Sequence, residues 1–262
     1  MMKSENKKSY SSFVVILLFV CLALVIIVSA VMIMPAIKNT KKYNAAVNEY
    51  NAYVESYNNL CQKACVDNIG GMAGEAVSLE PVAEGLFDVV KTLFQGNSAS
   101  KIASDTETLL ELARSIQEDM KVIEQITDPD ETWVMERIRG AEHVTDLQCV
   151  TLDHDPNQML GKSGGYKGCI YFSISVIDPD TVTGKDIVDK GTDGGGCVEI
   201  YSTLEDAEAR CSYLAGFDNT ILYTGSYAIV GTMVIRTSYR LNDEQQYALT
   251  DEITLELTRL DP

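Results

Sequence analysis

The pattern of hydrophobic and polar residues begins with a long apolar run. Residues 13–37 carry no charge and few polar side chains. A helix rises about 1.5 Å per residue, so a run of this length crosses the roughly 30 Å hydrocarbon core of a bilayer. We therefore predict a cytoplasmic tail at residues 1–12 and a transmembrane signal anchor at residues 13–37.

Two alternatives compete with an uncleaved anchor. Val28, Ser29 and Ala30 together resemble the processing site of a cleaved signal peptide. The apolar run continues to Ile37, whereas the apolar region of a signal peptide usually stops after about 7–15 residues. The other alternative is a buried helix of a soluble protein. The length of the run favours the uncleaved anchor.

Residues 38–127 show a helical period. Two stretches carry apolar residues at alternating spacings of four and three, which is the seam of a coiled coil. The first seam is Tyr43, Val47, Tyr50, Val54, Tyr57, Cys61 and Ala64, and the second is Leu109, Leu112, Ile116, Met120 and Ile123. Ser104 and Glu107 form a capping box that predicts the start of the second helix.

The first of these helices needs a partner to cover its tyrosine stripe. Asparagines crowd its other faces and lower its helix propensity; they are Asn44, Asn48, Asn51, Asn58 and Asn59. We expect residues 38–127 to form a helical stalk or hairpin that packs on itself. A homodimer through the stalk is the alternative.

Residues 128–262 change to the period of two that is typical of strands. Apolar residues alternate through 166–176, where Ile170, Phe172, Ile174 and Val176 share one face. Further strands are predicted at 147–152, 198–201 and 228–235, and helices at 131–139, after the Ser202–Glu205 capping box and at 243–260. The resulting β-β-β-α-β-α order predicts an α+β head with a mainly antiparallel sheet and helices on one face.

The charge separates the apolar end from the rest of the chain. The 262 residues hold 21 basic and 38 acidic side chains, for a net charge of −17. Residues 1–42 carry six lysines against Glu5, a balance of +5, which leaves −22 for residues 43–262. Binding a polyanion requires a basic face, so this balance argues against nucleic acid as a partner.

Six of the seven cysteines follow the apolar run, an even number suited to an oxidising compartment. We therefore place the C-terminal body outside the cell. The disulfide candidates are Cys149 with Cys169, Cys197 with Cys211, and Cys61 with Cys65. The first pair is expected on one face of two neighbouring strands, and the last either closes locally or links two chains.

Enzyme motifs are mostly missing. Gly161-Lys162-Ser163 lacks the glycine that opens a phosphate loop, because Pro156 occupies that position. With only His143 and His154, the chain has little material for a nucleophile–histidine pair. The sequence therefore predicts no catalytic residue and no cofactor.

Two loops are candidates for ligand binding. Asp153, Asp155 and Asn157 place oxygen atoms at alternate positions, as a calcium loop does, but Gln158 and Gly164 replace its turn glycine and closing glutamate. Asx turns at a strand end are the alternative interpretation. The glycines after Asp193 permit close approach of a ligand or another backbone, with a solvated hinge loop as the alternative. The candidate binding residues are Asp153, Asp155, Asn157, Gly164, Gly165, Tyr166, Asp193 and Gly194.

Three segments carry a resemblance to a known group of proteins. They are DPNQMLGKSGGY at 155–166, GGGCVEIY at 194–201 and EDAEARCSYL at 205–214. This pattern is similar to an extracytoplasmic module of membrane-anchored and surface proteins of Gram-positive bacteria, and the likeness spans about residues 127–260. It implies an external location and an anchor-plus-head architecture. It implies no reaction and no catalytic residues.

These observations together favour a single-pass, membrane-anchored extracellular protein whose α+β head binds a protein or another envelope component. An extracytoplasmic hydrolase acting on cell-wall polymers is one alternative, with acids around Asp153, Asp155, Asp178 or Asp180. A structural accessory subunit of an envelope complex is the other.

The predicted topology is testable on intact cells. External protease should remove the C-terminal body, because the foldable mass and six cysteines follow the anchor. Immunoblotting with an antibody against the C-terminal region measures the loss. Full protection in intact cells, with digestion only after lysis, would overturn this topology.

Overall fold

The computed structural model describes residues 5–67, 69, 76–94 and 99–260. The chain forms two compact units. The anchor unit consists of Met1–Val54 and Val77–Ser115, and the head unit consists of Glu55–Ala76 and Ile116–Pro262. The sequence-predicted boundary between residues 127 and 128 stays a prediction.

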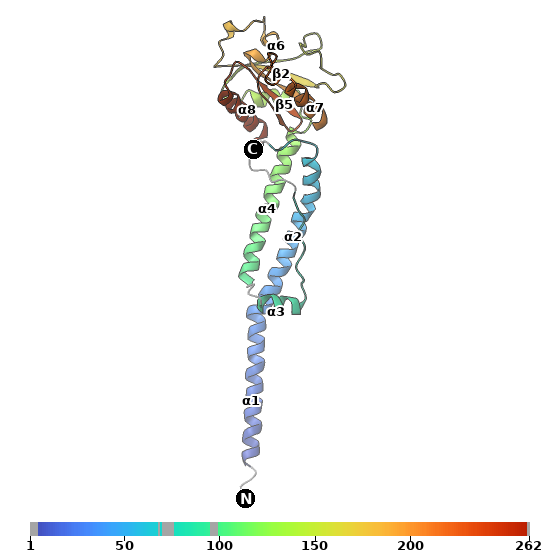
Figure 1. The fold of residues 1–262 in the computed structure, drawn as a ribbon. Coiled ribbons are helices and arrows are strands. Elements are labelled where there is room, and N and C mark those ends of the chain that lie inside the picture. Colours follow the sequence, from blue (N-terminus) through green and yellow to red (C-terminus); the bar gives the residue numbers. More distant parts are fainter. Residues whose placement is uncertain (1–4, 68, 70–75, 95–98, 261–262) are drawn as a thin grey trace. The chain divides into compact units, whose positions relative to one another are not determined.

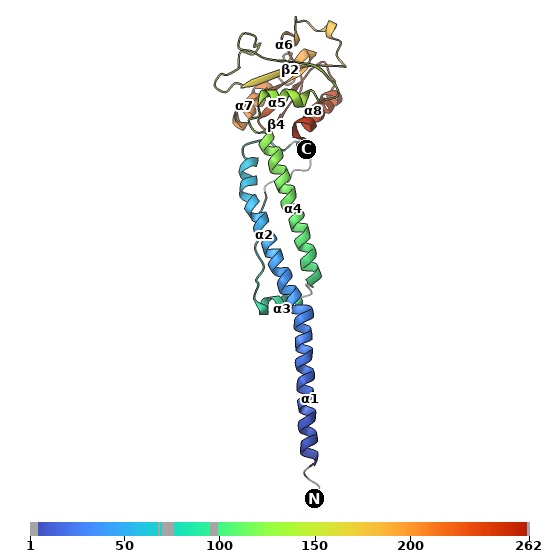
Figure 2. The ribbon, with the colours of Figure 1, turned by 180° about the vertical axis from the view of Figure 1, so that it is seen from behind.

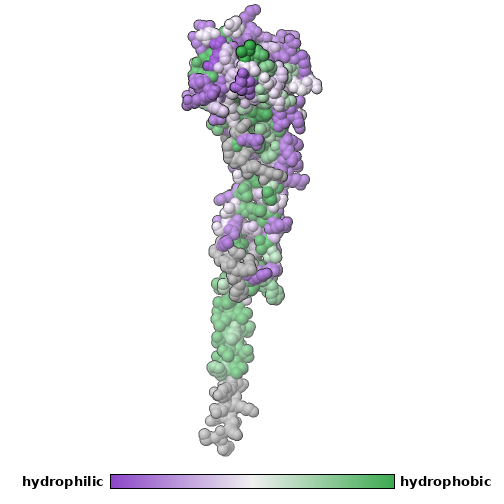
Figure 3. All heavy atoms as spheres, viewed as in Figure 1, coloured by the Kyte–Doolittle hydropathy of each residue, from purple (hydrophilic) through white to green (hydrophobic). Residues whose placement is uncertain are grey.

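The anchor unit begins with an unbroken helical stretch. α1 (Glu5–Val28) passes through one π-helical turn (Ser29–Ile33) into α2 (Met34–Cys61). The stretch Phe13–Cys61 contains a strongly apolar segment, none of which is buried. Figure 3 shows this apolar surface as a continuous band. Among the described residues, this is the one helix long and apolar enough to cross a membrane.

An extended segment lies along α2 and is held by asparagine side chains. In the anchor unit, Asn44 donates to the carbonyl of Val82 at 2.7 Å and accepts from its N–H at 2.9 Å. Asn51 makes the same pair of bonds with Leu79, at 2.7 and 2.9 Å. Each asparagine therefore pairs both backbone groups of one residue in the segment.

The spacing of these pairs fits both the helical backbone of α2 and the extended backbone of the segment beside it. Seven residues of α2 span about 10.5 Å, and three extended residues span about 10 Å. In the head unit, Asn58 pairs in the same way with Ala76, both bonds at 2.9 Å. These asparagines lower the helix propensity of α2 on its own, but they also hold the extended segment 76–82 against the helix.

The remaining helices of the anchor unit are α3 (Leu86–Phe94) and the first part of α4 (Ala99–Ile126). Figures 1 and 2 both show α4 running beside α2. The predicted seam residues Val47, Tyr50 and Val54 are at most 5% exposed. α4 starts before the predicted capping box at Ser104, which lies inside the helix. A homodimer through the stalk stays a prediction.

The head unit is built on a five-stranded sheet in which every neighbouring pair is antiparallel. Its order is β1-β2-β3-β5-β4. The strands are β1 (Val144–Cys149), β2 (Gly168–Ile174), β3 (Gly195–Ile200), β4 (Tyr227–Val230) and β5 (Met233–Thr237). This confirms the predicted α+β class and the mainly antiparallel sheet.

The strand predicted at 228–235 is in fact a hairpin of β4 and β5. Gly231 turns the chain with φ +61, and a Cβ there would lie 2.0 Å from the Ile126 carbonyl oxygen. The apolar residues on both sides of Gly231 and Thr232 resemble a single strand, which concealed this turn in the sequence. The N-cap of the helix predicted after Ser202 also shifts by one residue, because Thr203 accepts the hydrogen bond from the Asp206 N–H.

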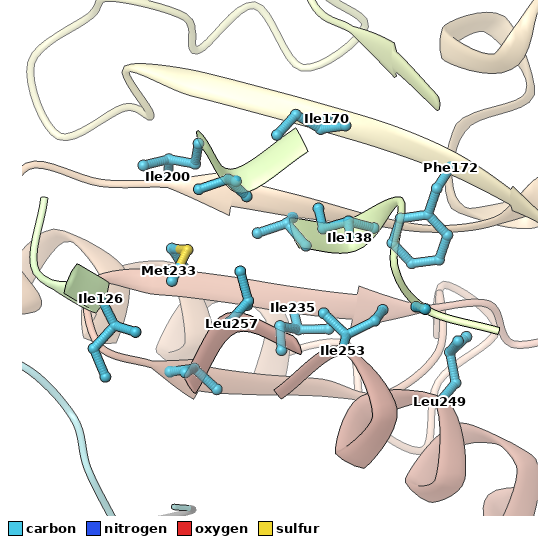
Figure 4. Packing of buried hydrophobic residues seen from close by; sticks show 14 of the residues in the cluster. Ile126, Ile138, Ile170, Phe172, Ile200, Met233, Ile235, Leu249, Ile253 and Leu257 are labelled. Atoms are coloured by element: carbon cyan, nitrogen blue, oxygen red, sulfur yellow. The ribbon is translucent and has the colours of Figure 1, made fainter. Parts of the chain in front are cut away.

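Helices cover both faces of the sheet, which corrects the expectation of one face. α5 (Glu131–Ile138) and α8 (Asp243–Thr258) pack in the first core with Ile170, Phe172 and Ile174, shown in Figure 4. α6 (Ile187–Lys190) and α7 (Leu204–Ala215) pack in the second core with Cys169 and Tyr171. The sequence pattern placed these last two residues outside because their side chains carry polar atoms.

None of the seven cysteines, all of which the structure describes, forms a disulfide. The predicted Cys149–Cys169 pair is wrong, because Cys149 stands opposite Ile170 and packs on the first core, whereas Cys169 belongs to the second. The error arose at Val150, which follows the end of β1 and is buried in the second core. Cys197 with Cys211 and Cys61 with Cys65 are likewise unbonded.

The end of α4 is part of the head's first core. Ile126 is fully buried there, and its carbonyl accepts from the Thr232 N–H at 3.0 Å. We expect Ile126→Ala to lower the free energy of unfolding by about 2–4 kcal/mol through lost burial and a residual cavity. Chemical denaturation followed by the fluorescence of Trp133, which packs on this core, measures the change.

Leu255→Ala in α8 is the matched control, because that side chain is 67% exposed. It should change stability by less than about 0.5 kcal/mol. If Ile126→Ala has an equally small effect, the head core does not include α4 and begins after it, near the predicted boundary at residue 127.

Candidate ligand-binding site

A cavity of about 510 Å³ opens beside α7 in the head unit. Its wall combines aromatic and aliphatic side chains with a few polar groups, and α7 supplies much of it. The lining residues include Asn157, Arg210, Tyr213, Phe217, Leu222 and Arg236. A cavity of this size, largely apolar with a few convergent polar groups, is typical of small-molecule sites.

The cavity ends on a buried ionic cluster. The Nε and Nη2 groups of Arg210 donate to the two carboxylate oxygens of Glu199, both at 2.8 Å. Arg236 donates from Nη1 to Glu199 Oε1 at 3.0 Å. The Tyr201 hydroxyl donates to Oε2 at 2.9 Å. Glu199 is 0% exposed, and each arginine is 7% exposed.

Three elements bring this cluster together. Glu199 lies on β3 opposite Val234 of β5, and Arg236 lies on β5 opposite Cys197 of β3. Side chains two apart on a strand share a face, so Glu199 and Arg236 meet on the second-core side. Arg210 comes down from α7, whose Ala207 and Leu214 pack into that core.

The cluster stays charged despite its burial. Burial disfavours the carboxylate, but hydrogen bonds from Arg210 and the charges of both arginines outweigh it and lower the pKa of Glu199. Burial likewise disfavours the two guanidinium ions, yet Glu199 helps to raise the pKa of both. Two cations and one anion leave this cluster with a charge of +1.

A polar network supports the loop at the other side of the cavity. The Tyr166 hydroxyl donates to Asp155, whose carboxylate also accepts from the N–H groups of Met159 at 2.7 Å and Leu160 at 2.8 Å. Asn157 donates to the Tyr171 hydroxyl at 3.0 Å. Although burial opposes it, the hydrogen bond from Tyr166 contributes most to lowering the pKa of Asp155.

The two polar groups adjoin each other in the second core. The rings of Tyr166 and Tyr201 meet edge to face, with centroids 6.4 Å apart. Tyr201 in turn contacts Glu199, as described above. The three sequence segments at 155–166, 194–201 and 205–214 thus converge around one cavity.

The predicted binding residues take different places. Asn157 and Gly164 line the cavity, and Asp155 and Tyr166 hold the loop that carries Asn157. Gly165 permits a close approach, since a Cβ there would lie 2.0 Å from the Met159 carbonyl oxygen.

The other three predicted residues, Asp153, Asp193 and Gly194, are not among the described lining residues. Asp193 lies in the short helical turn before β3, with its carboxylate 3.8 Å from Arg240.

The residues predicted to bind calcium, Asp153, Asp155 and Asn157, do not form a common cluster of oxygen ligands. Asp155 uses both oxygens within its own loop, in the manner of an Asx turn. A different cluster exists nearby, in which ligand atoms of His154, Asp186 and Asp189 lie within 4.8 Å of one another. Its members already bond each other and the turn before α6, with His154 Nε2 2.9 Å from Asp189.

Sequence reasoning missed Arg236 and the aromatic wall. Arg236 lies directly after the apolar residues 233–235 of β5, and a lone cation in such a position is the signal that was available. Tyr213 and Phe217 follow one another at a spacing of four around the end of α7, and their rings are 5.1 Å apart. Comparisons of the chain with protein-family models, curated proteins and solved structures found no match.

Removing the central carboxylate should destabilise the head. Glu199→Ala leaves two buried guanidinium groups without their shared anion, so we expect a loss of about 3–5 kcal/mol in unfolding free energy. Glu199→Gln keeps the shape and one acceptor oxygen, and should lose less. Denaturant titration of the full chain in micelles measures both. Equal, small losses below about 1 kcal/mol would contradict a structural role for this carboxylate.

Proposed function

We propose that the chain is a single-pass, membrane-anchored extracellular protein whose head unit binds a small ligand. The observation that carries this proposal is the cavity ending on Arg210 and Arg236. The uncharged, exposed surface of α1 from Phe13 to Val28 supports the membrane anchor. The head unit follows the anchor in the sequence, as expected for a signal anchor with an external body.

The wall of the cavity favours binding over hydrolysis. Its described lining residues include two arginines and no carboxylate, whereas glycoside hydrolysis uses a pair of carboxyl groups. The acids expected in a hydrolase lie elsewhere. Asp178 caps a short turn by accepting from the Asp180 N–H at 3.0 Å, and neither residue is among those that line the cavity.

The place of the motif residues adds further support. The segments that resemble the extracytoplasmic module supply Asn157, Glu199 and Arg210, which line or close the cavity. On this proposal, the membrane anchor holds that site at the cell surface.

A fragment screen on the full chain in nanodiscs tests the binding site. Tyr213 is 60% exposed on the cavity wall, so Tyr213→Ala removes contact surface with little effect on folding. Fragments detected by ligand-observed NMR should lose at least about fivefold in affinity, since one aromatic contact contributes about 1 kcal/mol. Tyr247→Ala, at a 72% exposed tyrosine on α8, is the control and should bind normally. Binding that is equally affected by both variants would overturn the proposal.

A further inference from the structure

We infer that the cavity takes a monoanionic ligand that joins a carboxylate-like group to an apolar or aromatic body. This inference rests on the proposed function and names the chemical class of the ligand. Its basis is the charge of the cluster at the end of the cavity, together with the nature of the wall.

The cluster has a net positive charge because two arginines share one carboxylate. Arg210 and Arg236 both pair with Glu199, which is the one carboxylate that either arginine contacts among the described residues. Guanidinium groups are well suited to bind carboxylate and phosphate through paired hydrogen bonds. A buried excess charge is unfavourable until an anion compensates it. Because both arginines line the cavity, a ligand can place that anion beside them.

The wall limits what the anion is attached to. Tyr213, Phe217 and Leu222 face the same space as the arginines. The guanidinium carbon of Arg210 lies 5.4 Å from the centroid of the Tyr213 ring, so the cationic and aromatic surfaces are continuous. A small inorganic anion would leave this apolar wall exposed to water, whereas an anion attached to an apolar group would bury it. Asn157 and Thr224 add polar contacts for a few further groups.

A charge series tests the inference on the full chain in nanodiscs of zwitterionic lipid. Arg236→Gln reduces the cluster from +1 to neutral, and Glu199→Gln raises it to +2 while keeping a hydrogen-bond acceptor. The probe is 4-fluorophenylacetate, with 4-fluorophenylacetamide as its neutral analogue and 4-fluorophenyl phosphate as the alternative anion. Line broadening in fluorine NMR reports binding, and far-ultraviolet circular dichroism confirms that each variant is folded.

The wild type should bind the acid at least about tenfold better than the amide. The preference should vanish in Arg236→Gln and grow in Glu199→Gln, whereas binding of the amide stays constant. Equal binding of acid and amide would overturn the ligand class and leave a binding site in place. No binding of any probe would overturn both this inference and the proposed function. Preference for the phosphate over the carboxylate would overturn the assignment of the anionic group.

A second observation, in the anchor unit, leads us to propose that α3 rests on the surface of the bilayer crossed by α1. The bonds of Asn44 place Val82 level with that residue. Seven residues earlier in α2 is Ile37, the last residue of the apolar run, and three residues after Val82 is Gly85. The matched rise of the two backbones thus brings the start of α3 to the level where the apolar run ends.

The exposed side chains of α3 suit this place. Phe87 is 87% exposed and Leu86 is 54% exposed, whereas Val89 is buried within the anchor unit. Figures 1 and 2 show α3 lying crosswise beside the lower part of α2, next to the end of α1. An amphipathic helix in the plane of the interface buries such side chains among lipid headgroups and upper acyl chains.

Tryptophan quenching by brominated lipid tests this placement. In a Trp133→Phe background, Phe87→Trp in nanodiscs should show a blue-shifted emission and clear quenching by lipid brominated near the top of the acyl chain, because an indole ring favours the membrane–water interface. Val14→Trp reports the anchor itself, and Leu112→Trp, at a 42% exposed position of α4, is the aqueous control. Quenching at Val14→Trp without quenching at Phe87→Trp would overturn the role of α3 and leave the anchor intact.

Discussion

Burial of the Glu199 carboxylate is the interaction on which the head depends. A carboxylate that is fully removed from water remains ionised only where cations and hydrogen bonds replace its hydration. Glu199 obtains these from α7 and β5 and from Tyr201 on its own strand. The register of two strands and the position of one helix are therefore coupled to one charged group. The arginine in excess is what gives the adjoining cavity its chemical character.

The fold was predictable where one residue class filled one face. Ile170, Phe172 and Ile174 alternate without exception, and they lie in the first core as expected. The second face was not predictable, because Cys169 and Tyr171 bury as readily as aliphatic residues while carrying polar atoms. That misreading accounts for the missed second helical layer, whereas the wrong Cys149–Cys169 pair arose from Val150, which is buried in the second core. Both errors concern packing between distant segments.

The candidate site was predictable only in its local part. Asp155 and Asn157 bond within a short loop, so turn chemistry alone marks them as organised. The contact between Glu199 and Arg236 joins residues 37 positions apart. Such a contact depends on strand order, which local pattern does not determine. The asparagines of α2 were misjudged for the same reason, since their partners lie up to 40 residues away.

The asparagine pairs also constrain how this part of the chain can change its length. One repeat combines seven helical residues with three extended ones, so an insertion in either segment alone moves every later asparagine out of line with its backbone partner. Growth or shortening that preserves the pairing occurs only in joint steps of seven and three residues, or about 10 Å. The length of this part of the chain can therefore change only in fixed steps.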